Sequence, residues 1–202
     1  MKQAHKEGFL REDINSKIGS IKAAETQKEY LTLEELQTLV RMDCKFPVLK
    51  KAVLFSSLTG LRFSDIKNLK WIDIQQSNHQ GGYFIKFRQQ KTKGVELIPI
   101  SDDAYRLLGE RLSSEKSVFQ GLNYSAHVAN YLKTWIKESG INKIITFHCF
   151  RHTYATLQLS YGTDLYTVSK MLGHRELKTT QVYAKVIDKT KRDAADRIKL
   201  DF

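Results

Sequence analysis

The feature that most constrains the fold is a β-rich block at residues 71–101, because the apolar patterns elsewhere in the chain are helical. Within it, WIDI, GGYFIKFRQ and GVELIPIS alternate apolar and polar residues or are rich in β-branched and aromatic side chains, as strands are. Gly81-Gly82 and Lys93-Gly94 stand between these segments as turn signals. The block predicts a small three-stranded antiparallel sheet, so we expect an α+β fold that is mostly α-helical.

Helix signals surround this block. Thr32 and Glu35 form a capping-box pattern at the start of one helix. A second helix follows Pro47, with one apolar face, and stops at Gly60, which suits the turn that ends a helix. Ser101 caps a further helix directly after the sheet, so each of these helices has a defined start or end.

The last third of the chain is also predicted to be helical. Residues 125–140 carry an apolar stripe at helical spacing, and three short helices are expected at HTYATLQLSYG, DLYTVSKMLGH and TTQVYAKVI. These patterns predict one domain over residues 30–187. Residues 1–29 are polar and resemble a linker or the remnant of another domain, and residues 188–202 form a charged tail helix.

Charge points to the kind of partner. Lys and Arg number 33 against 22 Asp and Glu, a net charge of +11, which favours nucleic acid or an anionic membrane surface. No uncharged apolar run approaches the roughly 18 residues of a spanning helix, and the first residues lack the apolar core of a signal peptide. Cys44 and Cys149 have neither CxxC nor metal-ligand spacing. We therefore expect a cytoplasmic protein with reduced thiols, no membrane partner, and Cys149 used for packing.

One set of residues could carry phosphoryl-transfer chemistry: Arg62, Lys91, His148, Arg151, His174 and Tyr183. Guanidinium groups match phosphate oxygens in pairs and stay charged at any cellular pH. Cations fixed around a phosphoryl group stabilise its transition state more than its ground state. A tyrosine can then act as a nucleophile that forms a covalent phosphotyrosine.

Two members of the set are candidates for moving protons. Tyr183 has an ordinary pKa of about 10, so it needs a positive surrounding or a base, for which His148 is the candidate. Lys91, at a predicted strand turn, could protonate a leaving alkoxide. Each residue alone has an ordinary explanation, since an H-x-x-R pattern is frequent on helices and Tyr183 could simply pack in the core. We expect the adjacent His152 to be structural.

Metal-dependent chemistry is the natural competitor for phosphodiester substrates. It needs carboxylates that converge on an ion, whereas the acidic pairs Glu34-Glu35 and Asp102-Asp103 are explained by helix starts. The sequence also lacks an H-E-x-x-H pattern and a Walker loop. We expect no metal and no nucleotide cofactor.

TGLRFSDI, QKTKGVELIPIS, HCFRHTYAT and LGHRELKTTQVYAK, in this order, resemble the catalytic domain of tyrosine recombinases, the phage integrase family. The resemblance covers about residues 30–190, and KTTQVYAKV looks most like integrases of mobile elements, including conjugative transposons. It implies that Arg62 and Arg151 clamp the scissile phosphate, that His174 adds a hydrogen bond, and that Asp65 holds Arg62 in place.

The resemblance also implies the course of the reaction. Tyr183 would attack to form a 3′-phosphotyrosine, His148 would assist proton movement at the tyrosine, and Lys91 would protonate the 5′-oxygen. Because the bond energy stays in the protein–DNA link, rejoining needs neither ATP nor another cofactor.

The implied partners are double-stranded DNA recombination sites and further copies of the chain. A monomer would form a homotetramer on two duplexes and act through a Holliday junction, with accessory DNA-bending proteins as further partners and the nucleoid as its location. Residues 188–202 would dock on a neighbouring protomer. The family usually carries an N-terminal core-binding domain that residues 1–29 cannot supply, so we expect a truncated protein that binds DNA weakly and with strong salt dependence.

Two other functions fit parts of the same pattern. One is a catalytically silent DNA-binding accessory protein of the same fold, although a pure binding protein needs no nucleophile. The other is a type IB topoisomerase, which uses similar chemistry. Formation of a covalent adduct distinguishes the first from an enzyme, and relaxation of supercoiled DNA without recombination would favour the second.

Overall fold

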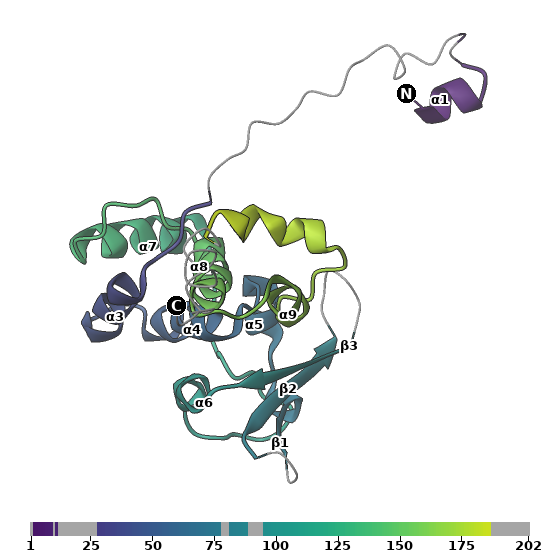
Figure 1. Cartoon of the computed structure of the whole chain (residues 1–202). Helices are drawn as coiled ribbons and strands as arrows, with labels where there is room; N and C mark the ends of the chain where they lie inside the picture. Colours follow the sequence, from purple (N-terminus) through teal and green to yellow (C-terminus); the bar gives the residue numbers. More distant parts are fainter. Residues whose placement is uncertain (1, 10, 12–27, 78–80, 89–94, 187–202) are drawn as a thin grey trace, which may run out of the picture.

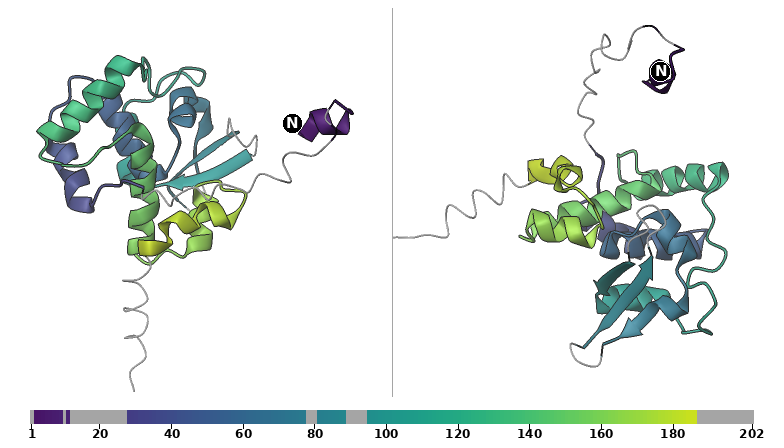
Figure 2. Two further views of the ribbon diagram at one scale, coloured as in Figure 1. Left: turned by 90° about the horizontal axis from the view of Figure 1, so that it is seen from above. Right: turned by 90° about the vertical axis from the view of Figure 1, so that its right-hand side faces the viewer.

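The structure is a computed structural model that describes residues 2–9, 11, 28–77, 81–88 and 95–186. A helical layer and a small sheet make up the fold, with the sheet and α6 below the helices in Figure 1 and in the right-hand view of Figure 2. The helices are α1 (Lys2–Lys6), α3 (Leu33–Arg41), α4 (Pro47–Thr59), α5 (Phe63–Asn68), α6 (Asp102–Leu108), α7 (Ala126–Glu138), α8 (Phe147–Ser160) and α9 (Leu165–Met171), with 3₁₀ turns η1 (Trp71–Asp73), η2 (Leu177–Thr179) and η3 (Gln181–Val186). The α+β prediction is confirmed.

Helix α4 is the centre of the fold, and α5, α6, β3 and α8 all pack against it. It begins with Pro47 in its first turn and ends at Gly60, which has a left-handed φ of 69°, as the sequence predicted. The sequence predicted that only one apolar face of α4 is buried. More of the helix surface is buried than this, because Ser56, Ser57 and Thr59 are buried as well. Their hydroxyl groups donate to backbone carbonyls, so they are buried without loss of hydrogen bonding.

The sheet has the predicted three antiparallel strands, in the order β1 (Ile74–Gln76), β2 (Tyr83–Arg88) and β3 (Val95–Ile100). Ile74 pairs with Ile85, and Ile85 pairs with Ile98, so three buried isoleucines form one row across the sheet. The first strand starts later than the WIDI pattern predicted. The first three residues of the WIDI segment, Trp71–Asp73, form the 3₁₀ turn η1 instead. In this turn the Asp73 carboxylate accepts a hydrogen bond from the backbone N–H of Lys70.

The last third is helical, but with different boundaries from those predicted. Helix α8 begins at Phe147 rather than at His152, where the predicted helix began, so it also contains His148 and Arg151. The last of the three short predicted helices, TTQVYAKVI, contains a 3₁₀ turn, η3, that packs against α8. None of the described helices is long and apolar enough to span a membrane.

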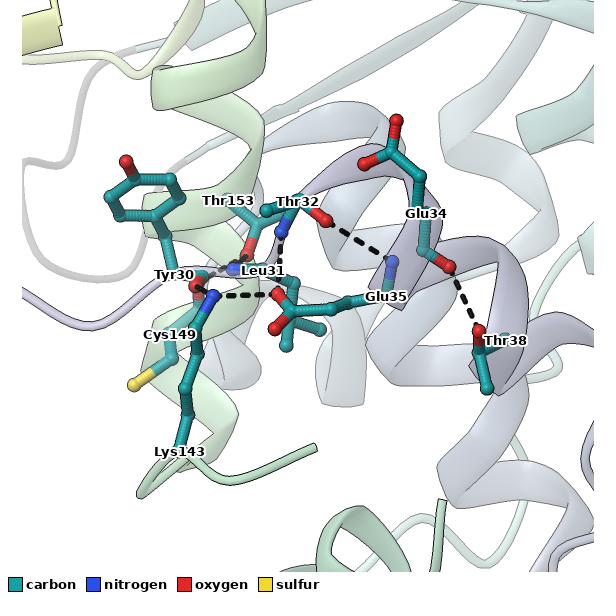
Figure 3. A network of polar contacts seen from close by, with 9 residues as sticks. All are labelled: Tyr30, Leu31, Thr32, Glu34, Glu35, Thr38, Lys143, Cys149 and Thr153. Carbon is teal, nitrogen blue, oxygen red and sulfur yellow. Dashed lines mark hydrogen bonds and ion pairs between the residues drawn. The ribbon is translucent and has the colours of Figure 1, made fainter. Parts of the chain in front are cut away.

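The segment before α3 is fastened to α8 by a polar network (Figure 3). The backbone N–H of Leu31 donates to Thr153 Oγ1 at a distance of 2.9 Å. Lys143 Nζ donates both to the Glu35 carboxylate, at 2.6 Å, and to the Tyr30 carbonyl, at 3.1 Å. Glu35 also completes the predicted capping box of α3, so one side chain caps a helix and holds the chain where it enters the domain.

Both cysteines are free thiols, as expected. Cys149 is buried in the first turn of α8, where its sulfur accepts from the backbone N–H of Thr146. The expected packing role is confirmed, together with a capping contact at the start of α8.

Substitution of Gly60 tests how tightly α4, α8 and α9 meet. A Cβ atom at this position would lie 2.5 Å from Tyr154 Cδ1 and 2.7 Å from Leu172 Cδ2. We expect Gly60→Ala to lower the free energy of unfolding by about 2–5 kcal/mol, since left-handed strain and overpacking add. Gly121 has a similar φ of 75° but nothing within 4 Å of its would-be Cβ, so Gly121→Ala should cost about 1 kcal/mol. Equal losses in urea unfolding would contradict this packing.

Candidate active site

Helix α8 supplies three of the polar side chains of the candidate site. His148, Arg151 and His152 stand at positions i, i+3 and i+4 of this helix, which places them on one face. Arg151 and His152 are buried, whereas His148 is exposed. The rings of His148 and His152 meet edge to face, with centroids 4.5 Å apart.

Arg151 joins the ends of two helices. Its Nη1 donates to the carbonyl of Gly60, at 2.5 Å, and its Nη2 donates to the carbonyl of Leu172, at 2.6 Å. Gly60 caps the C-terminus of α4 and Leu172 that of α9, and helix C-termini favour cations. Burial, followed by the nearby charge of Arg62, lowers the pKa of Arg151 to about 10. The guanidinium therefore remains charged at neutral pH.

Arg62 provides the second guanidinium from the N-cap position of α5. Its charge lowers the pKa of both Arg151 and His174, which places the three groups in one electrostatic environment. Arg62 Nη1 lies 3.9 Å from the buried carboxylate of Asp65. Neither carboxylate oxygen has a hydrogen-bond partner among the described residues, so Asp65 acts on the site through its charge.

His174 follows α9 and contacts Arg151 of the site. Its Nε2 lies 3.1 Å from Arg151 Nη2, and its Nδ1 lies 2.8 Å from Thr180 Oγ1. Arginine has only donors, so Nε2 accepts and Nδ1 carries the proton that it donates to Thr180. Burial, then the charges of Arg151 and Arg62, lower the pKa of His174 to about 4. An anion that bound the arginine would release Nε2 from this contact.

Tyr183 lies on η3 and is only 6% exposed. Its ring belongs to a small buried cluster on α8 and α9, with Tyr154, Ala155 and Leu172 among its members. The Tyr183 hydroxyl is 2.6 Å from His152 Nδ1. Burial raises the pKa of Tyr183, and Arg151 and Arg62 offset part of this effect. The tyrosine is therefore a neutral phenol in this state.

The structure thus brings together five of the six residues selected from the sequence: Arg62, His148, Arg151, His174 and Tyr183. Lys91 and the predicted tail helix at 188–202 lie outside the described residues. Within the described ranges, no group of three His, Cys, Asp or Glu side chains could hold a metal ion.

His152 has a contact that the sequence did not reveal. The sequence suggested a structural side chain, and in the structure its ring contacts the hydroxyl of Tyr183. Because α8 starts before His148, the spacing of four residues puts His148 and His152 on one helix face. Sequence spacing could not reveal that η3 brings the tyrosine to that face.

Two histidines, the buried His152 and the half-buried His174, predict that the protein loses stability in acid. Burial, followed by neighbouring positive charge, lowers the pKa of His152 and of His174 to about 4, from an ordinary value of 6.5. Between these values the unfolded chain binds more protons than the folded one, so stability is full above pH 6.5 and is lost as the pH falls towards 4.

We expect the melting temperature to fall by about 5 °C or more between pH 7 and pH 4.5. The double variant His152→Asn/His174→Asn should show a flatter profile than the control His5→Asn, in which an exposed histidine is replaced. Parallel profiles for the two proteins would show that these histidines do not cause the acid sensitivity.

Comparison with known proteins shows the family. Residues 29–190 match the model of the phage integrase family. The chain is 30% identical over 217 residues to tyrosine recombinase XerA of Pyrococcus furiosus, covering 98% of this chain and 72% of the relative. It is 27% identical over 199 residues to a tyrosine recombinase of Thermosipho africanus, covering 95% of this chain and 69% of the relative.

Solved structures show the same fold. A lambda integrase dimer bound to a COC′ core site has a TM-score of 0.69 at 21% identity, covering all of this chain and 71% of that one. The catalytic domain of bacteriophage HP1 integrase has a TM-score of 0.60 at 21% identity, covering 83% of this chain and 94% of that one. The protein is a tyrosine-type site-specific recombinase and belongs to the phage integrase family.

Proposed function

We propose that this recombinase cleaves and rejoins DNA by moving a phosphodiester bond onto Tyr183 and back, without metal or ATP. The observation that carries the proposal is the position of the buried Tyr183 hydroxyl, which lies 2.6 Å from Nδ1 of His152, the residue next to Arg151 on α8. Both Arg151 and Arg62 act on the pKa of this hydroxyl. A phosphate placed between them would meet donors suited to its oxygens.

In the proposed cleavage step, Arg62 and Arg151 bind the non-bridging oxygens of the scissile phosphate, and Asp65 holds Arg62 in place. The phosphate takes over donors of Arg151, which frees His174 Nε2 to become a donor to the phosphate once it carries a proton. Tyr183 attacks phosphorus, and the bond to the 5′-oxygen breaks.

Proton transfer completes the proposed cycle. Lys91 protonates the departing 5′-oxygen, which leaves a 3′-phosphotyrosine and a free 5′-hydroxyl. His148, exposed beside His152, assists proton movement on the tyrosine side. The 5′-hydroxyl of a partner strand then attacks the phosphotyrosine, so the energy of the broken bond is used to rejoin DNA.

Double-stranded DNA is the proposed partner. The net charge of +11 favours a polyanion. Structures of similar fold include XerH bound to its palindromic difH substrate and the Tn1549 transposon integrase in complex with a circular intermediate DNA. We infer that the free protein is a monomer and that four copies assemble on two DNA duplexes. The tetramer exchanges strands through a Holliday junction intermediate. Accessory DNA-bending proteins would be further partners, and the reaction would take place on the nucleoid in the cytoplasm. Residues 30–187 would hold the chemistry and residues 188–202 would dock on a neighbour.

Covalent capture tests the proposal and does not require a defined DNA site. The protein is incubated with a pool of nicked duplexes of random sequence, and adducts that resist detergent are isolated, sequenced and digested to peptides. We expect DNA on the peptide containing Tyr183, with the 3′-phosphate attached. Absence of adducts, or attachment to another residue, would overturn the proposal.

Removal of divalent metal tests the proposal that the reaction needs no metal ion. Because the guanidinium groups of Arg62 and Arg151 supply the positive charge, we expect EDTA to change the rate of adduct formation by less than about twofold, whereas metal-dependent transfer would stop. Mg²⁺ added back after EDTA is the control for indirect effects on the DNA.

A further inference from the structure

A second histidine contacts the oxygen of Tyr183 directly. His152 Nδ1 and the Tyr183 hydroxyl are 2.6 Å apart, and the two residues are 8% and 6% exposed. His152 directly follows Arg151 on α8, and Tyr183 lies on η3, so the packing of η3 on α8 sets this contact. Phenol is the stronger acid and imidazole the stronger base, so the hydroxyl donates and Nδ1 accepts.

We propose that His152 accepts the proton of Tyr183 during attack and returns it when the tyrosine leaves, a role that rests on the proposed function. As the Tyr183 oxygen bonds to phosphorus and the bond to the 5′-oxygen breaks, the hydroxyl proton moves to Nδ1 and forms an imidazolium. In rejoining, the 5′-hydroxyl attacks, the phosphotyrosine bond breaks, and His152 gives the proton back to the phenolate. The proton is conserved over the two steps, so this side of the reaction needs no co-reactant.

The surroundings of His152 keep its ring unprotonated at neutral pH. Burial is the main cause that lowers the pKa of His152 to about 4, followed by the charges of His148, Lys28, Arg151 and His174. Nδ1 therefore keeps its lone pair at neutral pH, and the neighbouring phenol stays neutral and unreactive. A phosphate bound at Arg151 adds negative charge, which offsets these cations and makes Nδ1 a stronger base as the reaction begins.

The direction of the hydrogen bond can be tested without DNA. In protein with ¹⁵N-labelled histidine, His152 Nδ1 should show the resonance of an unprotonated nitrogen that accepts a hydrogen bond. Tyr183→Phe should shift this resonance, whereas Tyr161→Phe, which changes an exposed tyrosine at the end of α8, should leave it unchanged. A protonated Nδ1 in the wild-type protein would overturn the proposal.

The catalytic role is tested by varying the leaving group in the rejoining step, on DNA captured as described above. One reaction starts from the natural phosphotyrosine complex, whose phenolate needs a proton. The other uses Tyr183→Phe protein and DNA with a 3′-p-nitrophenyl ester, whose leaving group needs none. His152→Asn keeps an acceptor oxygen but cannot carry a proton, so it should slow the first reaction about 100-fold and the second less than about threefold.

Comparing the two reactions separates chemistry from folding, because a misfolded variant loses both equally. Equal slowing of the two reactions would assign His152 a packing role and overturn the proposal. So would a variant His148→Asn that alone shows the leaving-group dependence, since His148 would then be the acceptor. Failure of the proposed function looks different, because the wild-type protein itself would form no adduct.

Discussion

Replacing Arg151 with alanine is expected to lower both the stability of the protein and the rate of DNA cleavage. The guanidinium donates to the carbonyls that end α4 and α9 and is only 3% exposed. Its loss leaves two buried carbonyls without their donor and a cavity between the helices, so we expect the free energy of unfolding to fall by about 3 kcal/mol. Loss of the phosphate clamp should slow adduct formation by about 10³-fold or more.

Two further variants separate these effects. Arg151→Lys keeps the charge but cannot reach both carbonyls and the phosphate with one ammonium group. It should recover more of the stability than of the cleavage rate, which we expect to remain about 100-fold reduced. Arg106→Ala is the control, because Arg106 is exposed and forms a surface ion pair with Asp103, so unfolding should change by less than about 0.5 kcal/mol. Urea unfolding and single-turnover cleavage measure the two quantities. An Arg151→Ala protein as stable as wild type would show that these carbonyl contacts contribute little.

The parts of the fold that local chemistry determines were predictable from the sequence. The capping box at Thr32 needs only two side chains three residues apart, and the end of α4 needs only a glycine that accepts positive φ. The sheet followed from alternation within short segments. In each case the deciding interactions lie within a few residues, so the pattern in the sequence carries them.

The start of α8 was not predictable in the same way. Arg151, His152 and Thr153 are polar, yet all three are buried, which breaks the apolar periodicity that marks a helix face. They are buried because partners from distant parts of the chain receive or supply their hydrogen bonds, including the carbonyl of Gly60 and the backbone N–H of Leu31. A single sequence shows neither partner.

The residues of the candidate site also differ in how far the sequence alone predicts them. Residue types suited to phosphate chemistry selected Arg62, Arg151 and His174 as candidates, because the hydrogen-bonding groups of arginine and histidine belong to the side chain alone. Which histidine contacts the hydroxyl of Tyr183 depends on how η3 packs against α8. Tyr183 follows His152 by 31 residues in the sequence. That choice is a matter of tertiary packing, and the sequence favoured the other histidine.

The second large effect is expected for Tyr183→Phe, which should form no detectable covalent adduct with DNA. The phenylalanine ring fills the same buried space but has no oxygen to attack phosphorus, so the residual rate should be at least about 10⁴-fold lower. Binding of DNA should stay within about twofold, since the arginines that contact phosphate are unchanged. Unfolding should change by only about 1 kcal/mol, because His152 Nδ1 loses its buried donor. Detergent-resistant adduct formation, gel-shift titration and urea unfolding measure the three quantities.

Tyr154 provides a matched control within the same buried cluster. Its hydroxyl donates to the sulfur of Met171, and burial raises its pKa to about 12, so it is a buried tyrosine with no link to His152 among its described contacts. Tyr154→Phe should therefore alter stability about as much as Tyr183→Phe but leave the adduct intact. An adduct that survives Tyr183→Phe would place the nucleophile elsewhere. Loss of adduct in both variants would instead point to packing of the cluster as the cause, because of these two tyrosines only Tyr183 has its oxygen within the influence of both Arg62 and Arg151.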